Sequence, residues 1–286
     1  MRASLFLIAI IDINLFVKNS QVSGYMDDFI QTTSNSDLQE AGRLAQNDAQ
    51  AVVDYFKLNR LAVQGSKTAL MVVRHNKTAR EDLKFEIDGK EIAQQNSFKI
   101  LGIEIDNQLS FESHVGVLVK RVRQTQAGLR RVAGRFPKNL GVMIINAMLV
   151  SKMTYGSFLF LSNKKHRKKL QKMLNDSIRF VARKKRIERV NMKELSKEMG
   201  IPTLKKVYQK QTLMEMVKMQ QKESLFVKTY EKTRNFTEEK LRPFGKKNIA
   251  KKSCLALMVK LWNAHSKRLK VMDAMDLKKF VKKEFI

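Results

Sequence analysis

The chain has 286 residues, of which 43% are hydrophobic and 8% aromatic, with only 3 prolines and 12 glycines. This composition excludes disordered, collagen-like and low-complexity proteins, and the length allows a substantial core in one or two domains. A single cysteine excludes an intramolecular disulfide, and Cys254 with four dispersed histidines has no spacing typical of a structural zinc site. A reducing compartment fits this cysteine content best.

The basic residues are concentrated in the second part of the chain. In total, 56 Lys and Arg against 27 Asp and Glu give a net charge of +29. Residues 1–115 contain 12 basic and 15 acidic residues, whereas residues 116–286 contain 44 and 12. A positive field over so long a segment is typical of proteins that bind a polyanion, most often nucleic acid. The alternative is a set of solubilising helix faces.

The N-terminus imitates a signal peptide. Arg2 precedes the apolar residues 5–11, but Asp12 interrupts this run and no small-residue cleavage site follows. The run is also much shorter than the roughly 20 residues that cross a bilayer. We therefore expect a buried element and an intracellular protein, cytoplasmic with access to the nucleus. A secreted or membrane-associated basic protein is the alternative, supported only by these first residues.

The first part of the chain is predicted to combine strands with one helix. Ser36 or Asp37 is a suitable N-cap for a helix whose apolar residues recur at three- and four-residue spacing as far as Phe56. Asp88-Gly89 is a strong hairpin turn signal. The strands are predicted at residues 21–26, 29–33, 69–73, 83–87, 90–93 and 98–106.

From about Ser110 the pattern becomes helical. An apolar stripe from Val115 to Val132 lies opposite a face with Lys120, Arg121, Arg123, Arg130, Arg131 and Arg135, and Pro137 is expected to end this helix. The next predicted helix, residues 140–152, is mostly apolar and is expected to be buried. Further helices are predicted at residues 163–186, 191–199, 203–222 and 276–285, with an irregular segment at 232–253. The cations of 183–186 suit the C-terminal dipole of a helix better than a nuclear address.

The sharpest chemical signal is Tyr25-Met26-Asp27-Asp28, between two predicted strands. Two adjacent carboxylates at a hairpin turn can present hard oxygen ligands to Mg²⁺, which nucleotidyl transfer uses to stabilise the attacking and leaving oxygens. An acidic pair alone is more often a simple surface turn.

Several further segments follow in the order seen in one family. The chain resembles the C-terminal two-thirds of the reverse transcriptases of non-LTR (LINE-type, jockey-like) retrotransposons. Met26 departs from the Ala common there, and the Pro that follows the LWN tail is missing. The segments that carry the resemblance are 5–13 (LFLIAIIDI), 17–28 (VKNSQVSGYMDD), 65–73 (GSKTALMVV), 98–106 (FKILGIEID) with 109–111 (LSF) and His114, and 260–263 (KLWN) with Leu269 and Phe280.

The resemblance implies an RNA-directed DNA polymerase that uses deoxynucleotides, with an RNA template and a DNA primer, or an RNA/DNA hybrid, as its partners. It implies Asp27 and Asp28 as catalytic ligands of Mg²⁺ (or Mn²⁺), and Lys67 as an acid that assists pyrophosphate departure. A solvated lysine in a turn, without a catalytic role, is an equally good interpretation of Lys67. Trp262 is better interpreted as a residue that packs in the core than as one that stacks on a base. The residues expected to contact nucleic acid are Tyr25, Met26, Leu101, Gly102, Lys120, Arg121, Arg123, Arg130, Arg131, Lys168 and Lys169.

We therefore expect an α+β chain. Residues 1–108 are interpreted as a partial polymerase palm with motifs C, D and E, a small antiparallel sheet with helices. Residues 109–231 are interpreted as a basic helical thumb, and 232–286 as a C-terminal connection. The fingers and the motif A carboxylate of the family would precede this sequence, and Asp12 is too distant from Asp27 to replace that carboxylate. We expect a truncated enzyme with little or no activity alone, and the alternative is a non-catalytic basic nucleic-acid-binding protein that retains the thumb.

Overall fold

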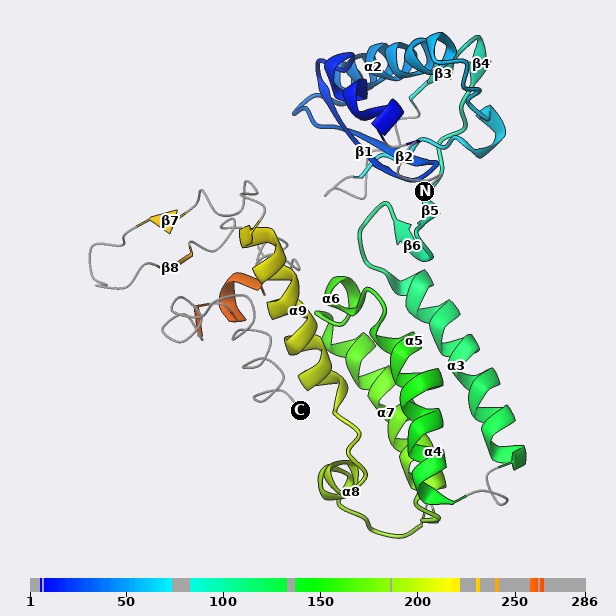
Figure 1. Ribbon diagram of the computed structural model, residues 1–286, viewed down its shortest axis with the longest axis vertical. Helices are drawn as coiled ribbons and strands as arrows, with labels where there is room; N and C mark the ends of the chain where they lie inside the picture. The colour runs from blue at the N-terminus through cyan, green and yellow to red at the C-terminus, as the bar shows by residue number, and fades with distance from the viewer. Residues whose placement is uncertain are drawn as a thin grey trace. The chain divides into compact units, whose positions relative to one another are not determined.

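The computed structural model has an α+β fold, as predicted, and divides into two compact units, Met1–Ser110 and Phe111–Ile286 (Figure 1). This division lies close to the boundary predicted after residue 108, whereas the identification of the units as palm and thumb stays a prediction. The helix predicted at 276–285 lies outside the described residues, as do Arg135 and Trp262 and most of 232–253. The structure describes residues 6, 8–73, 83–132, 137–185, 187–221, 230–231, 240–241, 258–261 and 263–264.

The first unit is built on an antiparallel hairpin and a long helix. Strand β1 (Ser20–Tyr25) pairs with β2 (Asp28–Thr33), so the predicted hairpin is confirmed, with its turn at Met26-Asp27 rather than at Asp27-Asp28. Helix α2 (Leu38–Leu58) packs on both strands. The predicted N-cap is also confirmed, because the Asp37 side chain accepts a 3.2 Å hydrogen bond from the backbone N–H of Gln39.

Two shorter hairpins follow. Strands β3 (Glu86–Ile87) and β4 (Lys90–Glu91) flank Asp88-Gly89, so the predicted hairpin turn is confirmed. Both turn residues have positive φ. Strands β5 (Ser97–Ile100) and β6 (Ile103–Asp106) form a second hairpin. The prediction of one continuous strand at 98–106 is therefore wrong.

The predicted strand at 69–73 is not formed either, since only Leu70 makes an isolated bridge, to Gln94. The segment before it contains a short 3₁₀ helix, η2 (Gly65–Lys67). Residues 11–15 form another 3₁₀ helix, η1 (Ile11–Leu15).

The core of the first unit lies on the apolar face of α2. One cluster joins Tyr55 and Phe56 to Val22 of β1 and to Ile10 and Ile13 of the N-terminal segment. A second cluster joins other residues of α2 to the β3–β4 region through Ala49, Val53, Phe85, Ile87 and Ile92. The predicted burial of the N-terminal segment is thus confirmed for one of its sides only, because Ile8, Ile11 and Leu15 are largely exposed.

The second unit is helical. Helix α3 (Glu112–Val132) is followed by one helical stretch that comprises α4 (Lys138–Ile144), the π-helical segment η4 (Ile145–Val150) and α5 (Ser151–Thr154). The described part of α3 ends at Val132, before Pro137, and Pro137 is the N-cap of α4. The remaining helices are α6 (Ser157–Phe160), α7 (Lys164–Val181), α8 (Met192–Glu198) and α9 (Leu204–Gln221).

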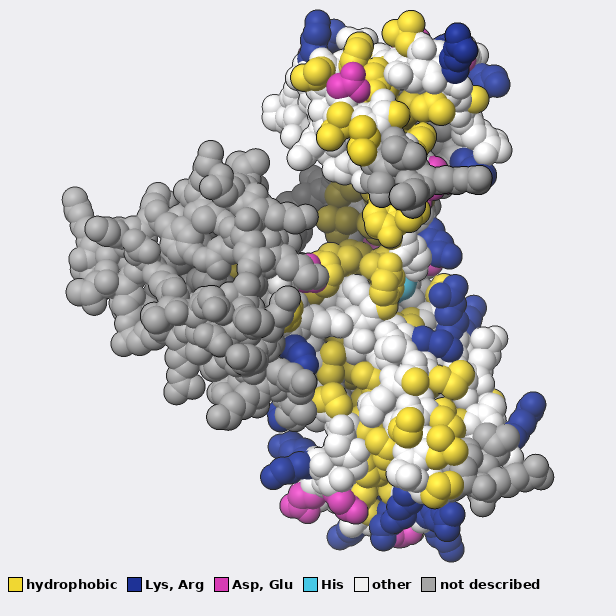
Figure 2. All heavy atoms as spheres, in the orientation of Figure 1, with side chains coloured by type: hydrophobic (Ala, Val, Ile, Leu, Met, Phe, Trp, Pro, Cys, Tyr) yellow, Lys and Arg dark blue, Asp and Glu magenta, His cyan; other side chains and the backbone are white. Residues whose placement is uncertain are grey.

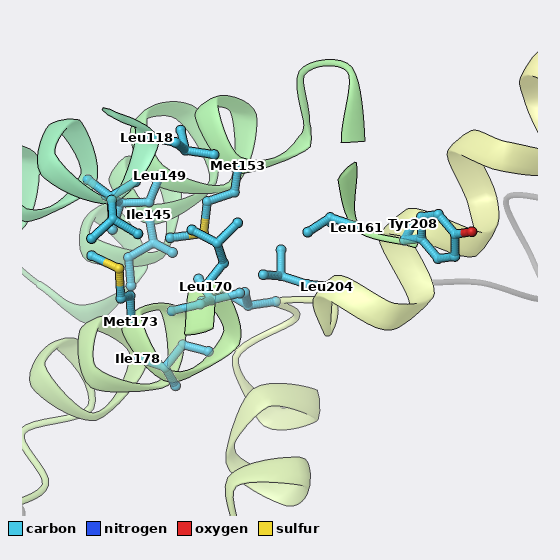
Figure 3. Packing of buried hydrophobic residues seen from close by; sticks show 14 of the residues in the cluster. Leu118, Ile145, Leu149, Met153, Leu161, Leu170, Met173, Ile178, Leu204 and Tyr208 are labelled. Atoms are coloured by element: carbon cyan, nitrogen blue, oxygen red, sulfur yellow. The ribbon is translucent and has the colours of Figure 1, made fainter. Parts of the chain in front are cut away.

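One hydrophobic cluster of the described residues joins these helices. Figure 3 shows Leu118 of α3, Ile145 and Leu149 of η4, Met153 of α5, and Leu170 of α7 gathered in it. The predicted burial of 140–152 is only half right, because Leu140, Met143 and Met148 of the same stretch are exposed. In Figure 2 hydrophobic side chains are accordingly visible over α4.

Two further observations complete the fold. Strands β7 (Tyr230–Glu231) and β8 (Lys240–Leu241) pair, so Lys240 and Leu241 are not irregular as predicted for 232–253. In the part of the chain that the structure describes, no helix combines the length and the apolar character needed to cross a membrane.

Candidate functional site

The Tyr25-Met26-Asp27-Asp28 segment forms the tip of the β1–β2 hairpin. Tyr25 and Asp28 are the last paired residues, and Met26 and Asp27 connect them. Met26 has a φ of 55°, a left-handed conformation that costs a residue with a Cβ atom about 1 kcal/mol or more. All four side chains are exposed, Tyr25 by 57% and Met26 by 46%. The hairpin therefore presents both carboxylates to solvent on a strained turn.

The two carboxylates at the tip make no interaction with other described residues of the protein. Among the described residues, neither the Asp27 nor the Asp28 side chain has a hydrogen-bond or ion-pair partner. Carboxylate oxygens are the ligands that Mg²⁺ prefers, so the donors are of the expected kind. However, the described residues contain no group of three or more His, Cys, Asp or Glu side chains that could hold a metal ion. Asp27 and Asp28 thus do not form a metal site by themselves.

A buried carboxylate on α2 fixes the start of β1. Asp48 is 4% exposed, and its Oδ2 accepts a 2.8 Å hydrogen bond from the backbone N–H of Asn19. Its Oδ1 accepts from the backbone N–H of Lys18 at 3.3 Å and from Nδ2 of Asn19 at 3.2 Å. Burial alone would raise the pKa of Asp48, but hydrogen bonds from Ser20, Asn19 and Lys18 together lower it. Asp48 therefore anchors the strand that leads to the hairpin tip.

Sequence reasoning missed this anchor. Asp48 lies three residues after Ala45 and four before Val52, on the apolar face predicted for the helix. A charged residue in such a stripe signals a buried carboxylate that needs hydrogen-bond donors.

Asp12 has a structural role in the same unit. The Tyr55 hydroxyl donates a short hydrogen bond to Oδ1 of Asp12. Burial of Tyr55 and the adjacent Asp12 carboxylate raise the pKa of the Tyr55 phenol to about 12. Asp12 lies in η1 and is not paired with β1 as a strand. It therefore joins the N-terminal segment to α2 rather than completing a site with Asp27.

The remaining predicted residues of the first unit lie in separate elements. Lys67 ends η2 and is exposed, with no ion pair to its ammonium group in the part of the chain that the structure describes. Leu101 and Gly102 form the β5–β6 turn with φ of 46° and 83°, and Leu101 is 44% exposed. The first unit thus has two hairpin tips with a non-glycine residue in the left-handed region and an exposed apolar side chain.

The predicted basic residues of the second unit are solvent-exposed. On α3 they lie opposite Val115, Leu118 and Val122, which are buried in the core. The same division occurs on α7, which packs against α3. Figure 2 shows dark-blue Lys and Arg side chains over α3. The exposed basic residues are Lys120, Arg121, Arg123, Arg130 and Arg131 of α3, and Lys164, Lys165, Lys168, Lys169 and Lys172 of α7.

These two helices therefore combine a shared apolar core with cationic outer faces, an arrangement suited to phosphate backbones. It brings the predicted basic residues into one unit, whereas the hairpin tips lie in the other. Comparison with known proteins adds no family, because no family model, curated protein or solved structure matches this chain.

Proposed function

We propose that this chain is part of a reverse transcriptase of the non-LTR type, and that these 286 residues bind nucleic acid without polymerising nucleotides by themselves. The observation that carries the proposal is the Tyr-x-Asp-Asp hairpin. Its two carboxylates are exposed at the tip and have no protein partner within the described residues.

The backbone at this tip supports a functional rather than an incidental turn. A two-residue hairpin turn that needs positive φ is normally made with Gly or Asn, yet Met26 adopts a φ of 55°. Strain of this kind persists only where the surroundings hold it, and it is concentrated at functional sites. The opposite end of β1 is held separately, by the buried Asp48.

The second hairpin and the helices that follow give independent support. Leu101 and Gly102 form the tip of the β5–β6 hairpin, and the chain then enters α3. Cationic side chains that lack a base-reading motif favour contacts with phosphates, which give affinity without sequence preference. An RNA/DNA hybrid is therefore the proposed partner.

The proposed lack of polymerisation rests on the number of carboxylates at the tip. Two metal ions in nucleotidyl transfer need ligands that no single turn provides, because Mg²⁺ requires near-octahedral oxygen geometry. Within the described residues, no further acidic side chain or histidine joins Asp27 and Asp28 to form a metal-binding group.

The experiment is a comparison of nucleotide incorporation on a primed RNA template. We expect the 286-residue chain to show no incorporation above its Asp27→Asn variant. A chimaera that adds the fingers and motif A of an intact related element should be active and should lose activity with Asp27→Asn. Asp54→Asn is the matched control, since Asp54 is an exposed carboxylate on α2. Robust incorporation by the chain alone would refute the proposed inactivity, and a chimaera indifferent to Asp27 would refute the site.

A second function is favoured by the construction of the helical unit. Phe111–Ile286 has its own core, around which the basic faces of α3 and α7 are arranged. A non-catalytic protein that binds nucleic acid needs only this unit. An inactive chimaera, together with salt-dependent binding of an RNA/DNA hybrid by the chain, would favour this function over the polymerase.

A further inference from the structure

The loop between α7 and α8 is strongly basic and has an apolar tip. Residues 183–189 contain five basic residues and one acidic residue. Ile187 is 93% exposed, more than any other large hydrophobic residue that the structure describes. A single exposed apolar residue is ordinary on a protein surface. Hydrogen bonds within this loop and to α7, however, keep Ile187 exposed.

The loop begins at a strained helix end. The backbone N–H of Lys184 donates to the carbonyl of Arg179 at 2.9 Å, and that of Arg183 donates to the carbonyl of Phe180 at 3.1 Å. These two hydrogen bonds define a Schellman C-cap, in which the left-handed position is usually glycine. Arg183 occupies that position with a φ of 56°. The predicted helix 163–186 therefore ends early, at Val181, and the chain turns away from it.

A side chain of α7 then clamps the loop. Nη1 of Arg179 donates to the carbonyl oxygens of Lys185 at 3.3 Å and Glu188 at 3.0 Å. The turn from Lys185 to Glu188 is closed by a 3.2 Å hydrogen bond from the Glu188 N–H to the Lys185 carbonyl. Ile187 lies within this turn. Its exposed position is therefore set by hydrogen bonds of the neighbouring residues, in which the Ile187 side chain takes no part.

Glu188, the only acidic residue of the loop, interacts with other residues of the same loop. Oε1 of Glu188 accepts a 2.8 Å hydrogen bond from the backbone N–H of Lys185, and its Oε2 lies 3.5 Å from Nζ of Lys184. Arg183, Lys185 and Arg189 are exposed, and none forms an ion pair within the described residues. The loop therefore presents free cations around an apolar tip.

We propose that this loop inserts Ile187 between bases of a nucleic-acid duplex while the surrounding cations bind the flanking phosphates. The proposal rests on the proposed function and assigns to this loop the local opening of the bound RNA/DNA hybrid. Lys and Arg side chains position a protein on phosphates, and an apolar side chain that enters between base steps partly unstacks them.

An anionic membrane is the other surface that attracts cations and apolar side chains together. Membrane binding scales with the apolar area that enters the interface, and this loop offers one side chain. A single isoleucine is sufficient as a wedge in a base stack but gives little membrane affinity. The observations therefore favour nucleic acid.

The test uses the full chain and a short RNA/DNA hybrid with 2-aminopurine in the DNA strand, because unstacking raises the fluorescence of this base. We expect the chain to raise the fluorescence on binding and Ile187→Ala to remove most of that rise. The variant should bind about 5- to 10-fold more weakly, with an unchanged salt slope. Ile11→Ala is the matched control, since Ile11 is an isoleucine that is 76% exposed in the first unit. Because Ile187 is almost fully exposed, its replacement leaves the fold intact.

The possible outcomes separate this proposal from the proposed function. Salt-dependent binding with a fluorescence rise that survives Ile187→Ala would overturn the wedge and leave the nucleic-acid function standing. Failure of the chain to bind the hybrid even at low salt would overturn both. Sedimentation with phosphatidylserine vesicles, lost in Ile187→Ala while hybrid binding is unaffected, would assign the loop to membranes and also overturn the wedge.

Discussion

Gly24 lies directly opposite Phe29 in the β1–β2 hairpin, and a Cβ atom on Gly24 would lie 2.8 Å from Cε1 of the Phe29 ring. The Phe29 ring cannot retreat freely, because it also contacts the Phe56 ring with a centroid distance of 5.0 Å. The absence of a side chain at Gly24 therefore allows Phe29 to lie across the strand next to the hairpin tip.

We expect Gly24→Ala to destabilise the hairpin by about 1 kcal/mol, as overpacking of an apolar contact does. Amide hydrogen exchange of β1 and β2 measures this effect, since it reports each unit separately. Gly116→Ala is the control, because a Cβ atom on Gly116 of α3 would meet nothing within 4 Å. This control should gain up to about 1 kcal/mol of helix stability. An unchanged exchange rate in Gly24→Ala would show that the Phe29 ring moves at no cost.

Asp48 makes the first unit sensitive to acid. Its pKa is lowered in the folded chain, so its contribution is present above the unfolded pKa and is lost as the pH falls through the folded value. Asp48→Asn should destabilise the unit by about 2 kcal/mol at neutral pH, because both carboxylate oxygens accept hydrogen bonds and an amide has only one acceptor. The loss should shrink in acid, where Asp48 is protonated.

Thermal unfolding at neutral pH and at a series of pH values below about 4, the ordinary pKa of an aspartate, checks this prediction. Asp54→Asn is again the control, since the exposed Asp54 accepts a single hydrogen bond, from Gln50. Equal losses in the two variants would show that Asp48 is not an anchor.

Tyr55 has the opposite dependence on pH. Its folded pKa of about 12 lies above the ordinary value of 10.0, so its contribution is complete below pH 10.0 and is lost as the pH rises toward 12. We expect Tyr55→Phe to cost about 1 kcal/mol at neutral pH, through loss of the hydrogen bond to Asp12, and to reduce the alkaline loss of stability. Near-ultraviolet absorbance during alkaline titration follows the phenol directly. A Tyr55 that titrates with the exposed tyrosines would contradict the structure.

The basic face of α3 should determine the salt dependence of nucleic-acid binding. Each lysine or arginine that contacts a phosphate contributes about one unit to the slope of log affinity against log salt. Replacing both Arg130 and Arg131 with Gln should therefore lower the slope by about two. Arg43→Gln is the control, because Arg43 already pairs with Glu40 in the first unit. Titration of an RNA/DNA hybrid at several salt concentrations gives the slope, and binding that is insensitive to salt would exclude this interface.

Local signals in the sequence were sufficient for much of the fold. The cap at Asp37, the Asp88-Gly89 turn and the apolar stripe of α3 each depend on neighbours within a few residues, and the structure has all three. Two of the errors occurred where a residue with a Cβ atom adopts the left-handed conformation. Leu101 divides the predicted strand 98–106 into a hairpin, and Arg183 ends α7 early. No local propensity favours either.

The residues of the candidate site could be predicted from the sequence, but the tertiary contacts that hold the hairpin and the loop in place could not. Asp27 and Asp28 are adjacent in the sequence, so their hairpin could be recognised from flanking strand patterns. The contacts of Asp48 with Lys18 and Asn19 span about thirty residues, as do many tertiary contacts that periodicity does not encode. The hydrogen bonds from Arg179 to the α7–α8 loop were missed for a different reason. Their acceptors are backbone carbonyls, which every residue type has.

The π-helical segment η4 determines on which side of its helical stretch the charged Lys152 lies. Gly141, Ile145, Leu149 and Met153 are all buried at intervals of four residues. In a regular α-helix each such step advances about 40° beyond a full turn, so a stripe of this spacing would drift around the axis. The wider π turn cancels the drift. Without it, Lys152 would rotate toward the core and Met153 away from it. Instead the Lys152 ammonium remains in solvent, where it donates a 2.9 Å hydrogen bond to Oγ1 of Thr125 on α3.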